Sequence, residues 1–370
     1  MPEDQLGLVV HRSDWALERN ANVFVWWPTG ELIACLNDAV TPVTVQTLIR
    51  WLGILASDDD ETVVIKRVWL EHYDVLAYAP QPLPDSKPLK DSHLLTKGVY
   101  GCFVQDPIDP TRMPKTSPWT PLHPTGTFKV LRETRIEKIR LRNTADSADA
   151  RIAMFMKNTG VSDDMRARSS GPRDRCAFTG SMGDGAGVDL HWIFPPFLFD
   201  MNETKGAPRS YDLASKQACR TVKNVLPMCE AVHKLWFENA FSVDVEDSYR
   251  IRTFTQAAVD IGLLERLIGK PEDLALSEKF LREHFFHTTL VRVRNGDIHD
   301  QDGILDMIGA IANHKADLME YGAKFDPKDE IWQSEVGRDA LELIGPEDLL
   351  PDSSRVDEGN SGVEVGEGEA

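Results

Sequence analysis

Apolar residues cluster in short runs over the first third of the chain. Segment 21–36 contains two strand-like runs on either side of a Pro-Thr-Gly turn signal. Segment 61–78 is rich in β-branched and aromatic residues, whereas the apolar positions of segment 45–55 have helical spacing. This pattern predicts a β-rich N-terminal region over residues 1–125 that contains at least one helix.

The pattern becomes helical and basic over residues 126–170. Apolar positions recur there mostly at steps of three and four residues, which predicts a helical connector. Its cations permit two interpretations, a solvated helix face with interleaved glutamates or a surface that faces phosphate. The cations are Arg132, Arg135, Lys138, Arg140 and Arg142.

A strand-like run and a helical pattern follow in the central segment 171–254. The apolar run 188–194 contains His191 and ends at a Pro-Pro turn, so it predicts a strand. From Asn224 onward, apolar positions at helical spacing predict a helix over 224–237 with Asn224 as its N-cap. His233 lies at the edge of the apolar stripe of that helix.

The remaining chain divides into a helical region and an acidic tail. Residues 255–345 predict a mainly helical C-terminal region, and residues 346–370 are acidic and poor in aromatics, which predicts disorder. The expected fold class is therefore α+β. The helices of that region are expected over 255–268, 276–286 and 303–321.

Composition limits the classes of protein that fit. A chain of 370 residues with 42% hydrophobic residues can form two or three domains with sizeable cores. It contains no apolar run of membrane-spanning length and no secretory signal pattern, so we expect an intracellular protein, cytoplasmic or nuclear, without membrane association. A net charge of −18 disfavours a general electrostatic grip on nucleic acid.

The two histidines of the central segment are the candidate metal ligands. Imidazole is the commonest metal ligand in proteins, and two imidazoles leave positions open on a divalent ion for water or substrate. Such an ion stabilises the negative charge that grows on a phosphate ester as it breaks. Taken alone, the residues favour His191 and His233 as core histidines with structural hydrogen bonds, and Asn224 as only a cap.

The five cysteines are an odd number without CxxC spacing, which favours a reduced protein over a disulfide scaffold. Cys176 and Cys229 lie in the two halves of the central segment. With a histidine they could hold a structural zinc ion. The alternative is that both are small buried apolar residues.

Four submotifs in order resemble HNH endonuclease domains. Residues 173–180 (RDRCAFTG) resemble the RDGxxCxxTG entry, 189–195 (DLHWIFP) the xxHHIxP strand, and 224–237 the NxxxLxxxxHxxF helix, with the usual sequel in 241–251. The long flanks are similar to those of fungal proteins with an HNH domain. The resemblance implies a central ββα-metal module, in which two strands and a helix surround one Mg, Mn or Zn ion, and DNA or RNA as partner.

The resemblance also implies a role for each residue. His191 and His233 match metal ligands, Asn224 matches the residue that orients the base, and the position of the base falls on Trp192. An indole N–H donates a hydrogen bond but cannot accept a proton from water. Since a general base typically contributes about 10²–10⁴-fold, its loss would severely reduce hydrolysis. The resemblance places nucleic-acid contacts at Arg173 and Arg175.

Three functional hypotheses follow. The sequence favours an HNH-like protein that binds metal with reduced or absent phosphodiester hydrolysis, because ligands are present and the base is not. The first alternative is an active metal-dependent endonuclease on DNA or RNA, in which water attacks phosphorus while the ion held by His191 and His233 stabilises the leaving oxygen. A one-residue bulge that turns His191 into the base, with Asp189 nearby as a substitute ligand, would supply the missing base. The second alternative is a non-catalytic interaction protein with structural histidines.

Overall fold

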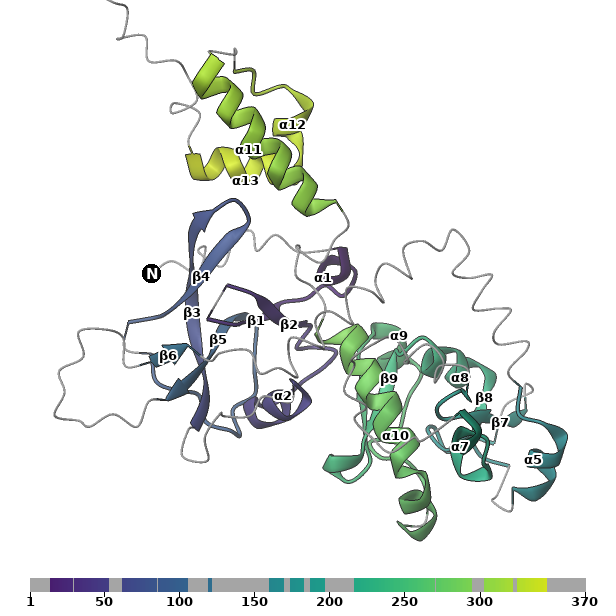
Figure 1. Cartoon of the computed structure of the whole chain (residues 1–370). Helices are drawn as coiled ribbons and strands as arrows, with labels where there is room; N and C mark the ends of the chain where they lie inside the picture. The colour runs from purple at the N-terminus through teal and green to yellow at the C-terminus, as the bar shows by residue number, and fades with distance from the viewer. Residues whose placement is uncertain are drawn as a thin grey trace, which may run out of the picture. The chain divides into compact units, whose positions relative to one another are not determined.

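The structure is a computed structural model of a mixed α+β protein (Figure 1). Contacts divide it into two compact units, Met1–Glu71 with Tyr78–Asp302, and His72–Ala77 with Gly303–Ala370. Among the residues described, no helix is long and apolar enough to cross a membrane. The described residues are 14–28, 30–52, 62–84, 86–105, 119–121, 160–169, 174–182, 187–196, 216–269, 271–294, 303–321 and 325–344.

Most of the expected basic connector and the whole acidic tail lie outside the described residues. The same holds for Arg173, one of the two expected nucleic-acid contacts. The predictions made for these segments therefore remain predictions.

A six-stranded mixed sheet forms the N-terminal part of the chain. Its strands are β1 (Val23–Trp26), β2 (Leu32–Leu36), β3 (Thr62–Asp74), β4 (Ala77–Pro82), β5 (Gly98–Gln105) and β6 (Trp119–Pro121). The strand order is β2-β1-β5-β3-β4, and β6 pairs with β5. The β1–β5 pair is parallel, whereas β1–β2, β3–β5 and β5–β6 are antiparallel.

Strands β1 and β2 are apolar and buried at every position because both of their faces are covered. Val23 and Val25 belong to the same buried cluster as Trp51 of helix α2 (Val45–Leu52). Trp26 belongs to a second cluster, where its ring meets Tyr78 of β4 with centroids 6.0 Å apart. A short helix, α1 (Asp14–Glu18), contributes to that second cluster.

The central segment forms a two-stranded antiparallel sheet followed directly by a helix. Strand β7 (Val188–Trp192) pairs with β8 (Val225–Cys229), and α8 (Glu230–Phe237) begins at the residue after β8. The short helices beside them are α5 (Asp163–Arg168), α7 (Lys216–Cys219) and the 3-10 turn η2 (Val222–Asn224).

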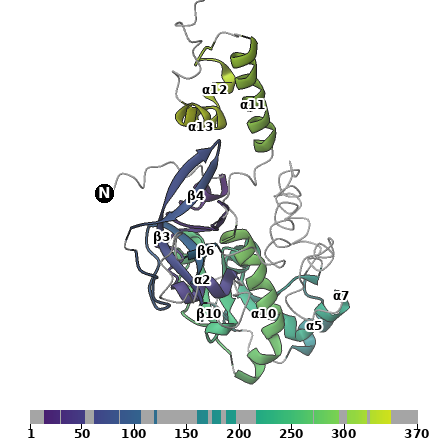
Figure 2. The ribbon, with the colours of Figure 1, turned by 60° about the vertical axis from the view of Figure 1, so that its left-hand side comes forward.

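A hairpin and a long helix complete the first unit. Strand β9 (Phe241–Asp244) continues through the 3-10 turn η3 (Val245–Asp247) into β10 (Arg250–Thr253). Helices α9 (Gln256–Asp260) and α10 (Pro271–Arg292) follow. Helix α10 packs against β9 (Figures 1 and 2). The Phe285 ring of α10 lies 5.4 Å from the Trp51 ring of α2.

Three aromatic rings form the centre of the core beneath α8. The Phe178 ring lies 5.0 Å from that of Trp236 and 5.1 Å from that of Phe241, and the Trp236 and Phe241 rings are 5.3 Å apart. All three side chains are almost fully buried. Offset and edge contacts of this kind add to the stabilisation from burial. This core fixes α8 relative to the segment that precedes β7.

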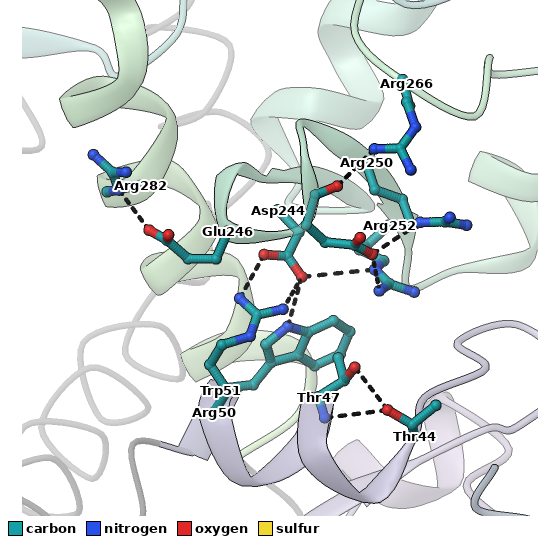
Figure 3. A network of polar contacts seen from close by, with 11 residues as sticks. Thr44, Thr47, Arg50, Trp51, Asp244, Glu246, Arg250, Arg252, Arg266 and Arg282 are labelled. Carbon is teal, nitrogen blue, oxygen red and sulfur yellow. Dashed lines mark hydrogen bonds and ion pairs between the residues drawn. The ribbon is translucent and has the colours of Figure 1, made fainter. Parts of the chain in front are cut away.

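Buried polar contacts join the hairpin β9–β10 to the N-terminal sheet region. The Thr41 hydroxyl donates to the Thr253 carbonyl at 2.8 Å, and the Thr253 hydroxyl donates to the Val40 carbonyl at 2.7 Å. Asp244, which is 1% exposed, accepts hydrogen bonds from Arg50 and Trp51 of α2 (Figure 3). The sheet region and the hairpin therefore share one interior.

The prediction of a helix over 224–237 is wrong for its first half and right for its second half. Residues 225–229 form β8, and the helix starts only at Glu230, with Cys229 rather than Asn224 at its N-cap. A short apolar run does not distinguish strand from helix, and pairing with β7 decides here. Pro227 is tolerated because its backbone faces away from β7, where its carbonyl accepts the Ala177 N–H at 2.8 Å, so the missing N–H breaks no bond between β7 and β8.

The second unit contains three helices, α11 (Ile304–Tyr321), α12 (Glu330–Gln333) and α13 (Glu335–Ile344), and the turn that joins β3 to β4. Asp339 of α13 is 1% exposed. Its carboxylate accepts a hydrogen bond from the backbone N–H of Leu76 at 2.6 Å and contacts His72 Nε2 at 3.1 Å.

The mainly helical C-terminal region agrees with the expectation in type but not in boundaries. The helix expected over 276–286 is α10, which runs from Pro271 to Arg292, and the one expected over 303–321 is α11. The helix expected over 255–268 is limited to α9, because the chain turns at Gly262, whose φ of 75° lies in the left-handed region.

Candidate functional site

Strand β7 separates His191 from Trp192 by directing them to opposite faces. The pairing with β8 is regular, with His191 opposite Leu226 and Trp192 opposite Val225. Successive side chains of a strand point to opposite faces. Leu226 belongs to the core beneath α8, whereas Trp192 and Val225 belong to a separate small cluster. His191 therefore lies on the face of the β7–β8 sheet on which α8 packs.

The structure brings His191 and His233 together. Their rings stack with centroids 3.8 Å apart and an interplanar angle of 20°. Both side chains are partly exposed, so the pair lies at the edge of the core rather than within it. His233 occupies the first turn of α8, which starts immediately after β8. The ββα connection thus places two imidazoles from residues 42 positions apart side by side.

The pKa of each imidazole is lowered from its ordinary value. For His191 burial is the main cause, and the charge of Asp189 opposes it. The pKa of His233 is lowered to about 4, mainly by burial and then by the neighbouring His191, while the charge of Asp189 opposes both effects. Both rings are therefore neutral at pH 7, which is the protonation state that binds a metal ion.

The two rings lie close enough for both to reach one divalent cation, since their centroids are 3.8 Å apart and two nitrogens bound to one zinc ion are at most about 4.2 Å apart. A metal ion lies in the plane of each imidazole that binds it, so two stacked rings do not point their nitrogens at a common position. A shared cation therefore requires one or both histidines to change rotamer. The described part of the chain contains no preformed group of three or more metal-binding side chains. Two imidazoles would thus leave the other positions of the ion to water or to a further ligand.

Asn224 ties together the loop beside the pair. Its amide nitrogen donates to the carbonyls of Phe194 (2.7 Å) and Cys219 (2.8 Å), and its side-chain oxygen accepts from the Phe194 N–H at 2.9 Å. The side chain is fully buried, so each of these bonds is screened from water. The indole N–H of Trp236 adds a bond to the Ile193 carbonyl at 2.9 Å. These contacts fix the chain directly after His191.

Trp192 does not face the histidine pair. Its indole is 8% exposed and packs with Met165, Leu190 and Val225 on the other face of the β7–β8 sheet. The position that the sequence motif assigns to the base therefore supplies apolar packing. The regular pairing of β7 with β8 also contains no bulge that would exchange the faces of the two residues.

Asp189 lies on the same face of β7 as His191, two residues earlier. Its carboxylate forms an ion pair with the Arg166 guanidinium of α5, and this pair lowers the pKa of Asp189. Arg166 also donates through Nε to the Val161 carbonyl at 2.9 Å. Sequence reasoning missed Arg166, because no motif or spacing rule links a short helix to a strand more than twenty residues later.

Cys176 and Cys229 meet, as one of the sequence hypotheses requires, but no third ligand joins them in the described residues. Burial raises the pKa of the Cys176 thiol. Hydrogen bonds from the Thr179 hydroxyl and from backbone N–H groups oppose this effect, and the net pKa is lowered. Burial raises the pKa of Cys229. The structural zinc therefore finds no support, whereas the packing interpretation fits their place in the core.

Of the two expected nucleic-acid contacts, only Arg175 is described, and it is exposed. Other exposed cations near the hairpin are Arg220, Lys223 and Lys234, which lie beside or within η2 and α8.

Comparison of the chain with protein-family models, with curated proteins and with solved structures finds no match in any of the three. The resemblance to HNH domains therefore rests on the submotifs of the sequence.

Proposed function

We propose that the central segment is an HNH-like module that binds a divalent cation through His191 and His233 and hydrolyses phosphodiesters slowly or not at all. The observation that carries the proposal is the stacked pair of neutral imidazoles at the junction of β7 and α8. The order of strand, strand and helix, together with the hydrogen bonds of Asn224, supports it further.

A bound cation would supply positive charge to a phosphate oxygen of the ligand. His191 and His233 would hold the ion, and Asn224 would keep the backbone after His191 in place. Once both imidazoles are ligands, Trp192 offers no base, since its side chain packs on the other face of the hairpin. Binding without efficient turnover is the expected result.

Metal titration tests the proposal directly. Isothermal titration of the full-length protein with Zn²⁺, Mn²⁺ and Mg²⁺ should show one site for at least one of these ions. His191→Ala and His233→Ala should each abolish that site. His93→Ala is the matched control, because His93 is exposed and far from the hairpin in sequence. Absence of binding, or binding that survives both substitutions, would contradict the proposal and favour structural histidines.

A plasmid-nicking assay separates the module from an active endonuclease. In the presence of Mn²⁺ or Mg²⁺ we expect the wild-type protein to nick no faster than His233→Ala. Without a general base, we expect phosphodiester hydrolysis to be about 10²–10⁴-fold slower than at a site that has one. Nicking by the wild type that disappears in both histidine variants would instead establish the active enzyme.

A further inference from the structure

The contact between Arg166 and Asp189 lies beside the proposed cation site. Asp189 and His191 are two residues apart on β7, so their side chains leave the strand on the same face. The Asp189 carboxylate is close enough to act electrostatically on both His191 and His233. It is turned toward Arg166 instead, in an ion pair whose side chains are 33% and 50% exposed.

Arg166 is held in this position independently of Asp189. It belongs to α5, whose N-terminus is capped by the Ser162 hydroxyl through the Met165 N–H, and its Nε donates to the Val161 carbonyl. Met165, next in the chain, is buried in the cluster that contains Trp192. The guanidinium is therefore anchored. The Asp189 carboxylate, whose side chain is 50% exposed, also accepts the Leu190 N–H at 2.7 Å, so it must turn away from both partners to reach the histidines.

We propose that Asp189 is the third protein ligand of the cation bound by His191 and His233, and that Arg166 holds its carboxylate when the cation is absent. This inference rests on the function proposed above. Two imidazoles and one carboxylate are a ligand set used by catalytic zinc sites and by iron(II) sites, with positions left open. Arg166 thus competes with the metal ion for the Asp189 carboxylate.

We expect the Asp189 carboxylate to exchange Arg166 for the metal ion. A partly exposed ion pair contributes little to stability because water screens both charges. A divalent cation already held by two imidazoles presents twice the charge to the carboxylate at shorter range. Metal binding should therefore break the Arg166–Asp189 pair rather than be excluded by it.

Three variants of the full-length protein test this. Asp189→Asn should weaken Zn²⁺ or Co²⁺ binding at least tenfold in isothermal titration, because an amide is a poorer ligand than a carboxylate. Arg166→Ala should strengthen binding several-fold, because the competitor is removed. The matched control is Arg168→Ala on the same helix, whose partner is Asp164 rather than Asp189, and it should leave the dissociation constant unchanged. Circular dichroism verifies that each variant is folded.

The outcomes separate this inference from the proposed function. Binding by the wild type that depends on both histidines but is unchanged in Asp189→Asn would overturn the role of Asp189 alone. Weaker binding in Arg166→Ala would show that Arg166 supports the site and would overturn the competition. If the wild type binds no metal at all, the proposed function fails and this inference fails with it.

Discussion

His191 and Trp192 are neighbours in the sequence, but β7 directs their side chains into different surroundings. His191 stacks on His233, whereas Trp192 fills an apolar cluster on the other face. A shift of one residue in the pairing of β7 with β8 would exchange these roles, because every side chain of the strand would change face. The register of the β7–β8 pairing thus determines which residue can contact a cation.

Replacing Trp192 with histidine should therefore not create a nuclease. In Trp192→His the new imidazole would occupy the cluster of Met165, Leu190 and Val225 rather than approach His233. Loss of the large ring from a buried site should lower the free energy of unfolding by about 2–4 kcal/mol. Urea denaturation and plasmid nicking measure the two effects.

Trp192→Phe, which keeps an apolar ring, is the control for stability and should lose less. Nicking by Trp192→His that also required His233 would show that the motif position faces the site after all. The assignment of faces given above would then be wrong.

His284 is a buried histidine whose role is structural. Its Nε2 donates to the Trp236 carbonyl at 3.0 Å, its Nδ1 accepts from the Ser242 hydroxyl at 2.8 Å, and its ring stacks on Trp236 at 3.5 Å. Burial, as the main cause, lowers its pKa to about 3. His284 belongs to no sequence motif, so only its tertiary contacts identify its structural role.

The lowered pKa of His284 predicts loss of stability in acid. Below the ordinary pKa of 6.5 the unfolded chain binds a proton that the folded chain refuses until about pH 3, so stability falls as the pH is lowered. For this one group the loss between pH 7 and pH 5 is about 2 kcal/mol. Urea denaturation at several pH values should show a shallower dependence in His284→Gln. Trp192→Phe, which removes no titratable group, should keep the wild-type slope.

At the scale of elements, Asp244 joins β9 to α2. Arg50 donates to both of its carboxylate oxygens at 2.7 Å, and the Trp51 indole donates at 3.0 Å (Figure 3). The Asp244 hydrogen bond is the largest cause that raises the pKa of Arg50. Arg252 lies close by, with its Nε 3.7 Å from the same carboxylate. The buried anion is thus surrounded by donors from two separate elements.

Removing Asp244 should be costly, because the cations around it would lose their buried partner. We expect Asp244→Ala to lower the free energy of unfolding by about 3–5 kcal/mol. Arg282→Ala should cost less than about 1 kcal/mol, since its pairs with Glu246 and Glu278 are both more exposed. Chemical denaturation of both variants measures the difference. Equal losses would mean that the burial of Asp244 does not decide its contribution.

Elements with an unambiguous local pattern of apolar, glycine and proline residues were predictable from the sequence. The strand that carries His191 is confirmed, because apolar residues between Gly-rich and Pro-rich segments leave few alternatives. The run 225–229 was not predictable in this way. Its apolar positions suit a helix equally well, and only pairing with β7, more than thirty residues earlier, makes it a strand.

At the scale of the whole molecule, the sequence predicted the mixed α+β class and a β-rich beginning but not the pairing of distant segments. The contact between His191 and His233 was expected only through the resemblance to HNH domains. The partners of Asp244 and Asp339 were not expected at all, because no local pattern encodes a contact across 194 or 263 residues. Such contacts depend on the tertiary fold and leave no periodic signal in the chain.

The second unit offers a test of how independently the two units are stabilised. Asp339 accepts the Leu76 N–H and contacts His72, so it joins α13 to the turn between β3 and β4. Leu76 has a φ of 52°, a left-handed conformation that is costly for a residue other than glycine. Asp339→Ala leaves the N–H of Leu76 without its buried acceptor, which should cost about 1–3 kcal/mol.

That loss should be local, because Asp339 and its partners all belong to the second unit. Hydrogen exchange should therefore accelerate in the turn 72–77 and in α11–α13, while β7, β8 and α8 keep the protection they have in the wild type. Asp329→Ala is the matched control, since Asp329 lies in the same unit but is exposed. Equal acceleration in both units would show that they unfold together, and the metal site would then depend on the C-terminal helices for its stability.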